Sequence, residues 1–141
     1  MIIVLDASAG IEIVFGRERA GDFTAQVLTA SKVITSDLYK AETANVIWKY
    51  VQAGLLKKEK AILSLELCVN LIDDFVDISE NNEEAINESI RLNHSVYDLL
   101  YFTLARRNGA MLLTLDKKLN ELSEENGITT LGQKLGTGPD L

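Results

Sequence analysis

The apolar positions of the chain form short continuous runs separated by longer stretches with helical spacing. Residues 2–5 (IIVL) and 111–115 (MLLTL) are the two strongest runs. The run at 2–5 is continuous and that at 111–115 is interrupted only by Thr114, which is typical of strands that are buried on both faces of a sheet. Shorter runs at 33–34, 75–78 and 128–131 predict three further strands.

The stretches between these runs have the periodicity of helices. Helices are predicted at about 7–15, 21–30, 38–53, 57–72, 82–92, 96–108 and 116–126. Ser36 and Asp37 are residue types that favour a helix start, and Gly54 and Gly109 favour helix ends. Short strands that alternate with helices indicate βαβ units, so the fold class is α/β with a central parallel sheet flanked by helices on both faces.

The chain is long enough for one domain and contains no internal repeat or linker. A domain of 141 residues buries roughly 68% of its unfolded surface, which is enough for a core without disulfides or metals. Aromatic residues make up only 6% of the chain, so the core is expected to be aliphatic. We assign residues 1–135 to the domain and residues 136–141, which are rich in glycine, to a flexible C-terminal tail.

The counts of cysteine and histidine exclude several kinds of site. One cysteine allows no internal disulfide, and one histidine, His94, rules out a multi-histidine zinc site. Cys68 lies between Leu67 and Val69, which favours buried packing. No apolar run approaches the ~20 residues of a membrane span, and the N-terminus lacks the basic flank of a signal peptide. We therefore expect a cytoplasmic protein with no membrane contact.

The formal net charge of −7 argues against a nucleic-acid function when it is taken alone. The distribution of the charged residues along the chain weakens that argument. Seven of the 21 acidic residues lie between positions 73 and 88, where there is no Lys or Arg, and the other 14 equal the 14 basic residues in number. The acidic stretch is interpreted as a solvated loop and helix face, with a negative patch for a basic partner as the alternative.

Four acids stand in apolar or helix-forming surroundings. Asp6 and Asp116 follow the two strongest strands, at the carboxyl edge where parallel sheets bind ligands. Glu42 and Asp98 lie in predicted helices. Each acid alone has a structural explanation. Asp6 and Asp116 can cap the helices that follow them, Asp98 can complete a capping box with Ser95, and Glu42 can lie on a solvated face.

Considered together, the four acids predict a metal site. One pair of carboxylates about 5 Å apart repels by about 3 kcal/mol at an effective dielectric constant near 20, so such a cluster needs a cation or bound protons. Carboxylate oxygens suit Mg²⁺, with Mn²⁺ as the alternative. The expected chemistry is metal-assisted hydrolysis of a nucleic-acid backbone. The hydroxyls of Ser8 and Thr114 are placed to hydrogen-bond the carboxylates or a bound water.

Four segments carry a family resemblance. Residues 4–8 (VLDAS), 38–46 (LYKAETANV), 95–101 (SVYDLLY) and 113–119 (LTLDKKL) resemble the ordered motifs of PIN domains, and most closely those of VapC-type toxin ribonucleases. The likeness runs from residue 2 to about residue 131. The family often has a proline ahead of the long helix, where this chain has Thr35, Ser36 and Asp37.

The resemblance implies a doubly wound sheet of about five strands with an acidic Mg²⁺ site. It implies that Asp6, Glu42, Asp98 and Asp116 are the catalytic and metal-binding acids, supported by Ser8 and Thr114. It further implies an RNA substrate with single-stranded or looped regions and a homodimer. A small antitoxin protein that blocks the site and binds DNA is implied as well.

The leading hypothesis is a Mg²⁺-dependent endoribonuclease that acts as the toxin of a type II toxin–antitoxin pair. Asp6 and Asp116 are expected to be the principal metal ligands and Asp98 the third, while Asp98 or Glu42 activates water. The candidate phosphate contacts are basic residues scattered along the chain, which are Lys40, Lys49, Arg106, Arg107, Lys117 and Lys118. Their alternative role is helix C-terminal charge or a solvated face.

Three alternatives remain open. A PIN-domain nuclease that processes RNA without an antitoxin would have the same motifs. A non-catalytic PIN-like binding module would keep the fold, although loss of one or more acids would be expected. A phosphoryl-transfer enzyme with an aspartate nucleophile fits poorly, because the phosphatase type would need an aspartate at position 8, where the chain has Ser8.

Overall fold

A parallel sheet forms the centre of the protein. The computed structural model describes residues 1–131, and within them the strands are β1 (Ile2–Leu5), β2 (Lys32–Ser36), β3 (Asp74–Val76) and β4 (Met111–Leu113). Their order across the sheet is β3-β2-β1-β4, and all three pairings are parallel. This arrangement confirms the predicted α/β fold with a central parallel sheet.

Helices fill the connections between the strands. In chain order they are α1 (Ala7–Val14), α2 (Ala20–Thr29), α3 (Leu38–Gln52), α4 (Ala61–Asn70), α5 (Asn82–Leu92), α6 (Val96–Asn108) and α7 (Lys117–Glu125). Short 3₁₀ helices cover Lys58–Lys60 and Ile78–Glu80. The predicted helices all form, with ends that differ by a few residues.

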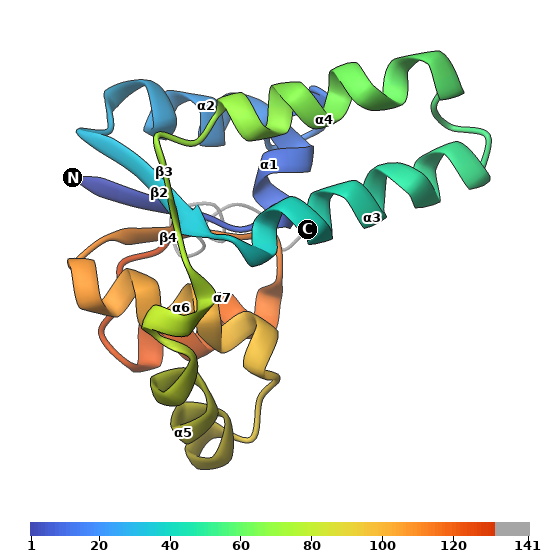
Figure 1. The fold of residues 1–141 in the computed structure, drawn as a ribbon. Coiled ribbons are helices and arrows are strands. Elements are labelled where there is room, and N and C mark those ends of the chain that lie inside the picture. The colour runs from blue at the N-terminus through green and yellow to red at the C-terminus, as the bar shows by residue number, and fades with distance from the viewer. Residues whose placement is uncertain (132–141) are drawn as a thin grey trace.

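The helices make two layers, one on each face of the sheet (Figure 1). On one side α1 contacts α2, α3 and α4. On the other side α6 packs on β1, β2 and β4 and also contacts α5 and α7. Because the chain passes from β1 to β2 and β3 on one side and then returns to place β4 on the other, the strand order reverses at β1. In sheets of this kind such a reversal marks the usual ligand-binding edge.

Burial explains why the two apolar runs predicted strands correctly. Val4, Leu5, Leu112 and Leu113 have no exposed surface, as expected for strands covered on both faces. Cys68 is also completely buried, which confirms its packing role.

Three predicted element boundaries differ from the structure for local reasons. The segment 128–131 forms only an isolated parallel bridge between Thr130 and Leu112 instead of a full strand. The strand predicted at 75–78 ends at Val76, because Asp77 caps a 3₁₀ helix through the Ser79 N–H. The helix predicted at 57–72 splits into a 3₁₀ turn followed by α4.

The start of α3 also differs from the expected cap. Asp37 makes no side-chain cap hydrogen bond, and its carboxylate instead pairs with Lys40 at 3.1 Å. The Ser36 hydroxyl accepts a hydrogen bond from the Leu38 N–H at 3.2 Å. Of the two predicted caps, only Ser36 therefore bonds a backbone N–H of the first turn.

Most acidic side chains of the stretch 73–88 form hydrogen bonds or ion pairs within the fold. Asp73 accepts a hydrogen bond from the Val33 N–H at 2.8 Å, and Asp74 pairs with Lys32 at 3.0 Å. Both contacts connect β3 and the residue before it to β2. Together with the cap formed by Asp77, these contacts give this part of the stretch a structural role, which the predicted solvated face did not include.

The remaining part of this stretch pairs with arginines of α5 and α6. Glu84 bonds Arg106 and Arg107 at 2.7 and 2.6 Å. Glu88 bonds Arg91 at 2.7 Å and also bonds Arg106. These contacts join α5 to α6. The hydrogen bond from Arg91, with the second from Arg106, lowers the pKa of Glu88 to about 2.

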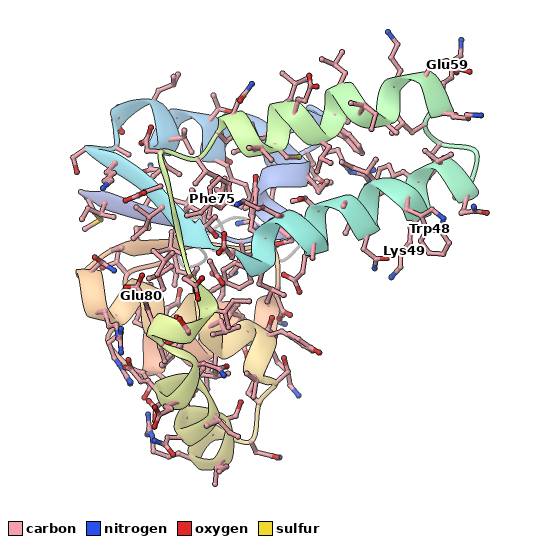
Figure 2. All side chains as sticks on the ribbon, in the orientation of Figure 1. Trp48, Lys49, Glu59, Phe75 and Glu80 are labelled. Carbon is pink, nitrogen blue, oxygen red and sulfur yellow. The ribbon has the colours of Figure 1, made fainter. Side chains whose placement is uncertain are left out.

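Helices α3 and α4 form an antiparallel pair that extends away from the sheet (Figure 1). Figure 2 shows Trp48 and Lys49 on the outer side of α3 and Glu59 at the tip of the pair. Several large apolar side chains of this pair are at least 45% exposed, namely Trp48, Leu55, Ile62, Leu63 and Leu67. No helix within residues 1–131 has both the length and the apolarity needed to cross a membrane. The predicted tail at 136–141 lies outside the described residues.

Gly10 allows α1 to pack closely on α3, and its substitution tests this contact. A Cβ at position 10 would lie 3.0 Å from two ring carbons of Tyr39 and closer still to the hydroxyl, which donates a hydrogen bond to the Cys68 carbonyl at 2.7 Å. We expect Gly10→Ala to lower the free energy of unfolding by about 1–3 kcal/mol through overpacking. Urea denaturation measures this change.

Gly21→Ala in α2 is the matched control, because nothing lies within 4 Å of a Cβ at that position. We expect this variant to be as stable as the wild type or slightly more stable. Equal stability of the two variants would contradict the packing role of Gly10.

Candidate active site

Asp6 lies at the carboxyl end of β1, where it caps α1. Its Oδ1 accepts hydrogen bonds from the Ala9 N–H at 3.0 Å and from the Ser8 hydroxyl at 2.6 Å. The Asp6 N–H in turn donates to the Leu113 carbonyl of β4 at 3.1 Å. Asp6 is only 6% exposed, so this carboxyl group is both buried and fixed in direction.

The loop after β4 lies directly beside Asp6. The Ser8 hydroxyl accepts a hydrogen bond from the Leu115 N–H at 2.9 Å and lies 3.4 Å from the Thr114 hydroxyl. Thr114 Oγ1 accepts a hydrogen bond from the Asp116 N–H at 3.0 Å. Ser8 and Thr114 therefore link the two loops that carry Asp6 and Asp116. These bonds also explain why β4 ends at Leu113. The backbone N–H groups after it donate to the Ser8 and Thr114 hydroxyls and not to a neighbouring strand.

Asp116 begins α7, and its side chain has two roles available to it. Its Oδ1 accepts the Leu119 N–H at 3.0 Å as an N-cap. The second oxygen, Oδ2, accepts no hydrogen bond from residues 1–131, and the residue is exposed. The cap and a contact with a ligand are therefore compatible.

Glu42 and Tyr101 join α3 to α6 at the same edge of the sheet. The Tyr101 hydroxyl donates to Glu42 Oε1 at 2.6 Å. Tyr101 is 1% exposed, whereas Glu42 is half-buried. Glu42 is therefore anchored and does not lie on a purely solvated helix face.

Asp98 lies in the first turn of α6, and its carboxylate contacts His94. Asp98 Oδ2 lies 2.8 Å from His94 Nε2. Ser95 caps the helix by accepting the Asp98 N–H at 3.3 Å, so half of the predicted capping box is formed. The Asp98 carboxylate bonds His94 and not the Ser95 backbone, which leaves Oδ1 without a hydrogen-bond donor among the described residues.

The pKa values of Asp6, Glu42 and Asp98 are raised mainly by burial, with smaller contributions from neighbouring carboxylates. Burial raises the pKa of Asp6 to about 6, against the lowering effect of its hydrogen bonds, and the charge of Asp98 raises it further. Burial also raises the pKa of Glu42 and that of Asp98. The Asp98 charge adds to the rise at Glu42, and the Asp116 charge adds to that at Asp98. The charge of Asp98 thus contributes to the shifts at two of the other acids.

The oxygen atoms of the four acids are the donor set available to a divalent cation. The carboxylates of Glu42, Asp98 and Asp116 are each held through one oxygen, and their other oxygens accept no hydrogen bond from residues 1–131. The Asp6 carboxylate is held by Ser8 and Ala9, and a hydrogen bond from Thr114 also lowers its pKa. All-oxygen ligands of this kind fit a hard cation such as Mg²⁺. In the described part of the chain, however, no three His, Cys, Asp or Glu side chains lie close enough to form a ready ligand group. The chemistry of the donor atoms therefore fits a hard cation, although their present spacing does not form a complete ligand group.

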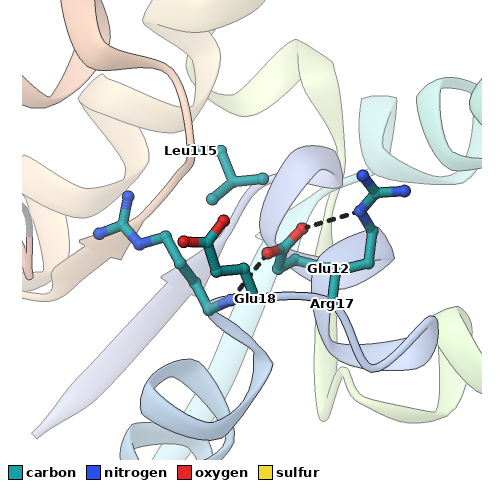
Figure 3. Close-up of a pocket in the computed structure, with 5 residues that line it drawn as sticks. Glu12, Arg17, Glu18 and Leu115 are labelled. Atoms are coloured by element: carbon teal, nitrogen blue, oxygen red, sulfur yellow. Dashed lines mark hydrogen bonds and ion pairs between the residues drawn. The ribbon is translucent and has the colours of Figure 1, made fainter. Parts of the chain in front are cut away.

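A hollow of about 450 Å³ is bordered by Leu115, the residue before Asp116, and by the α1–α2 connection (Figure 3). Glu12 is buried and accepts the Arg19 N–H at 2.9 Å, while Arg17 lies 3.8 Å away. Glu18 also lines the hollow. Two acids and two arginines balance each other, so the hollow has no net charge to hold a phosphate.

Only some of the predicted phosphate contacts are available. Lys40 pairs with Asp37 and lies 4.4 Å from the centre of the Phe75 ring. Arg106 and Arg107 are engaged by acids of α5. Lys117 and Lys118 are exposed in the first turn of α7, next to Asp116, and make no ion pair with the described residues.

Two contact residues of the site were missed by the sequence analysis. His94 and Tyr101 lie four residues before and three residues after Asp98. Helical spacing of three or four residues from a candidate acid could have drawn attention to both. Nothing in the sequence, however, indicates that Tyr101 reaches Glu42 on another helix.

The fold and its acidic edge, which we define as the carboxyl edge of the sheet with Asp6, Glu42, Asp98 and Asp116, indicate a class of protein. A PIN domain model matches residues 3–125, and the chain therefore belongs to the PIN-domain family. The chain is also 32% identical to ribonuclease VapC3 from Pyrobaculum aerophilum over 126 residues, which covers 86% of this chain and 94% of the relative. The VapC-type resemblance of the motifs is thereby confirmed.

Solved structures support the fold assignment. The Pyrobaculum aerophilum protein PAE2754 superposes with a TM-score of 0.73 at 20% identity, covering 97% of this chain and 94% of that chain. VapBC2 from Rickettsia felis, bound to a promoter DNA fragment, gives 0.65 at 16% identity over 92% of this chain and 97% of its own. VapC20 from Mycobacterium tuberculosis, a toxin that cleaves the sarcin–ricin loop, gives 0.64 at 17% identity over 85% and 94%.

The raised pKa of Asp6 predicts a cost to stability. Between about pH 4 and pH 6 the folded protein retains a proton on Asp6 that the unfolded chain has released, so the free energy of unfolding falls as pH rises. At pH 7 the buried charge costs up to about 3 kcal/mol. We expect Asp6→Asn to recover part of this energy in the presence of EDTA and to flatten the pH dependence. Urea denaturation from pH 4 to pH 8 measures both effects.

Asp22→Asn serves as the control, because Asp22 is an exposed acid in the first turn of α2. This variant is expected to keep the wild-type pH profile. An Asp6→Asn profile that also runs parallel to the wild type would contradict the assigned shift.

Proposed function

We propose that this chain is a Mg²⁺-dependent endoribonuclease, the toxin of a type II toxin–antitoxin pair. The observation that carries the proposal is the grouping of Asp6, Glu42, Asp98 and Asp116 at the carboxyl edge of a PIN-domain sheet, with electrostatic coupling through Asp98. The name of the relative with 32% identity, ribonuclease VapC3, supports the same activity.

The cation would be held by carboxylate oxygens of Asp6, Asp98 and Asp116, with Glu42 as a fourth carboxylate. Mg²⁺ is the first choice and Mn²⁺ the alternative. When bound, the cation supplies Lewis-acid stabilisation of the phosphodiester and makes the attacking water more acidic. Ser8 and Thr114 support the two loops from which Asp6 and Asp116 project.

A general base must accept the proton of the attacking water. Asp98 and Glu42 are the proposed candidates, because Asp6 is assigned to the cation as a principal ligand and burial also raises the pKa of Asp98 and Glu42, which favours a base near neutral pH. The contacts with His94 and Tyr101 restrict each carboxylate to one orientation. In this proposal an RNA strand lies across the edge, with Lys117 and Lys118 beside its phosphates.

RNA single strands and loops are the proposed substrate, because their backbone is accessible to a site of this shape. We also propose a cognate antitoxin protein as a partner, supported by the VapBC2 complex of Rickettsia felis among the structural relatives. A homodimer in the cytoplasm is proposed too, and the exposed apolar side chains of α3 and α4 favour association.

Cleavage of cellular RNA tests the nuclease activity. We expect purified wild-type protein to produce discrete fragments with Mg²⁺ and none with EDTA. Asp98→Asn removes the negative charge of this acid and should reduce the rate by on the order of a hundredfold or more. The measurement is the rate of fragment appearance on a denaturing gel.

Glu83→Gln is the matched control, because Glu83 is an exposed acid of α5 and should leave cleavage unchanged. Equal cleavage by Asp98→Asn would place the active site elsewhere. A folded wild type that cleaves no RNA with Mg²⁺ or Mn²⁺ would favour the binding-module alternative. Cleavage without any antitoxin partner in the cell would favour a processing nuclease.

A further inference from the structure

The contact between Tyr101 and Glu42 crosses from one helix layer to the other. Glu42 lies in α3, which packs against α1, whereas Tyr101 lies in α6 beneath the sheet (Figure 1). The phenol ring is buried and only its hydroxyl reaches the acidic edge, at 2.6 Å from Glu42 Oε1. The same helix α6 carries Asp98 one turn earlier, so a single rigid element supplies one acid and the donor that holds another.

Glu42 has no other fixed partner in the described chain. Its side chain makes no ion pair within residues 1–131, and Oε2 accepts no hydrogen bond there. A half-buried glutamate on a helix surface has three side-chain torsions, and ordering them costs rotamer entropy. Without Tyr101, nothing among the described contacts would keep this carboxylate at the acidic edge.

Tyr101 is suited to this task because it remains a donor under all relevant conditions. Burial and the nearby charge of Glu42 raise the pKa of the phenol, so the hydroxyl keeps its proton. It adds no positive charge, and the carboxylate therefore stays available to a cation. A lysine or arginine at this place would instead form an ion pair that competes with the cation.

We propose that Tyr101 is a positioning residue that holds Glu42 Oε1 and thereby presents Oε2 to the cation site and the RNA. The inference rests on the proposed function, since it assigns a role within that site. In this proposal Tyr101 is a fifth side chain of the site, and the orientation of the Glu42 carboxylate depends on the position of α6.

The test compares two buried phenols in the full-length protein. Tyr101→Phe removes the hydroxyl that holds Glu42. Tyr39→Phe removes another buried hydroxyl, which donates to the Cys68 carbonyl at 2.7 Å, and it touches none of the four acids. We expect a similar loss of stability in both variants. Only Tyr101→Phe should lower the affinity for Mn²⁺, by about tenfold, as measured by isothermal titration calorimetry.

RNA cleavage provides the second measurement. Tyr101→Phe should lower kcat by about tenfold with little change in KM, because the phenol is buried away from the substrate, whereas Tyr39→Phe should change neither constant. In a Glu42→Gln background the further change from Tyr101→Phe should disappear if Tyr101 acts through Glu42. Full wild-type affinity and kcat in Tyr101→Phe, or an equal effect in the Glu42→Gln background, would overturn the proposal.

A cation-free measurement separates this inference from the proposed function. Crystal structures of the wild type and Tyr101→Phe in EDTA should show Glu42 ordered in the first and turned to solvent in the second. If the wild type neither binds Mn²⁺ nor cleaves RNA, the proposed function fails. An unchanged Glu42 conformation in Tyr101→Phe would contradict the positioning role whether or not the protein is a nuclease.

Discussion

The parallel pairing of β1 with β4 is the constraint on which the site depends. Its register places Leu5 opposite Leu113, so that Asp6 and the loop leading to Asp116 leave the sheet at the same edge. The hydrogen bond from the Asp6 N–H to the Leu113 carbonyl and the bond from the Leu115 N–H to Ser8 extend this pairing beyond the strands. The helices then add the other two acids. Because β1 has no exposed surface at Val4 and Leu5, the position of the site is coupled to the most deeply buried part of the core.

The parts of this arrangement that could be predicted from sequence are those set by local patterns. Unbroken apolar runs identified β1 and β4, and an acid directly after each run has only one edge of a parallel sheet on which to lie. The weakest run, 128–131, predicted a strand but forms a single bridge at Thr130. Asp37 was a reasonable helix cap by residue type, yet a neighbouring lysine competes for its carboxylate. The hydrogen bond from Tyr101 to Glu42 could not be predicted from the sequence, because it depends on how the two helix layers pack against each other.

The distribution of charge explains how the proposed RNA substrate is compatible with an acidic protein. The arginines of α5 and α6 pair with Glu84 and Glu88, so they stabilise the fold and are not available to phosphates. These ion pairs also neutralise part of the negative charge of the stretch 73–88, which is distant from Asp6 in the sequence. What remains near the site is a group of carboxylates with the exposed Lys117 and Lys118 beside them. A bound divalent cation would reverse the local sign of the field, which the net charge of −7 does not describe.

The two sets of acids in this protein also differ in the kind of donor that holds them. Glu88 is held by arginine, which lowers its pKa to about 2 and uses its charge in a permanent ion pair. Asp6, Glu42 and Asp116 are held by hydroxyls and backbone N–H groups, which fix direction without cancelling charge. Burial then raises the pKa of Asp6 and Glu42, so these carboxylates remain electrostatically unsatisfied in the folded chain. Burial of these oriented carboxylates opposes folding at neutral pH, and a bound cation would offset this cost.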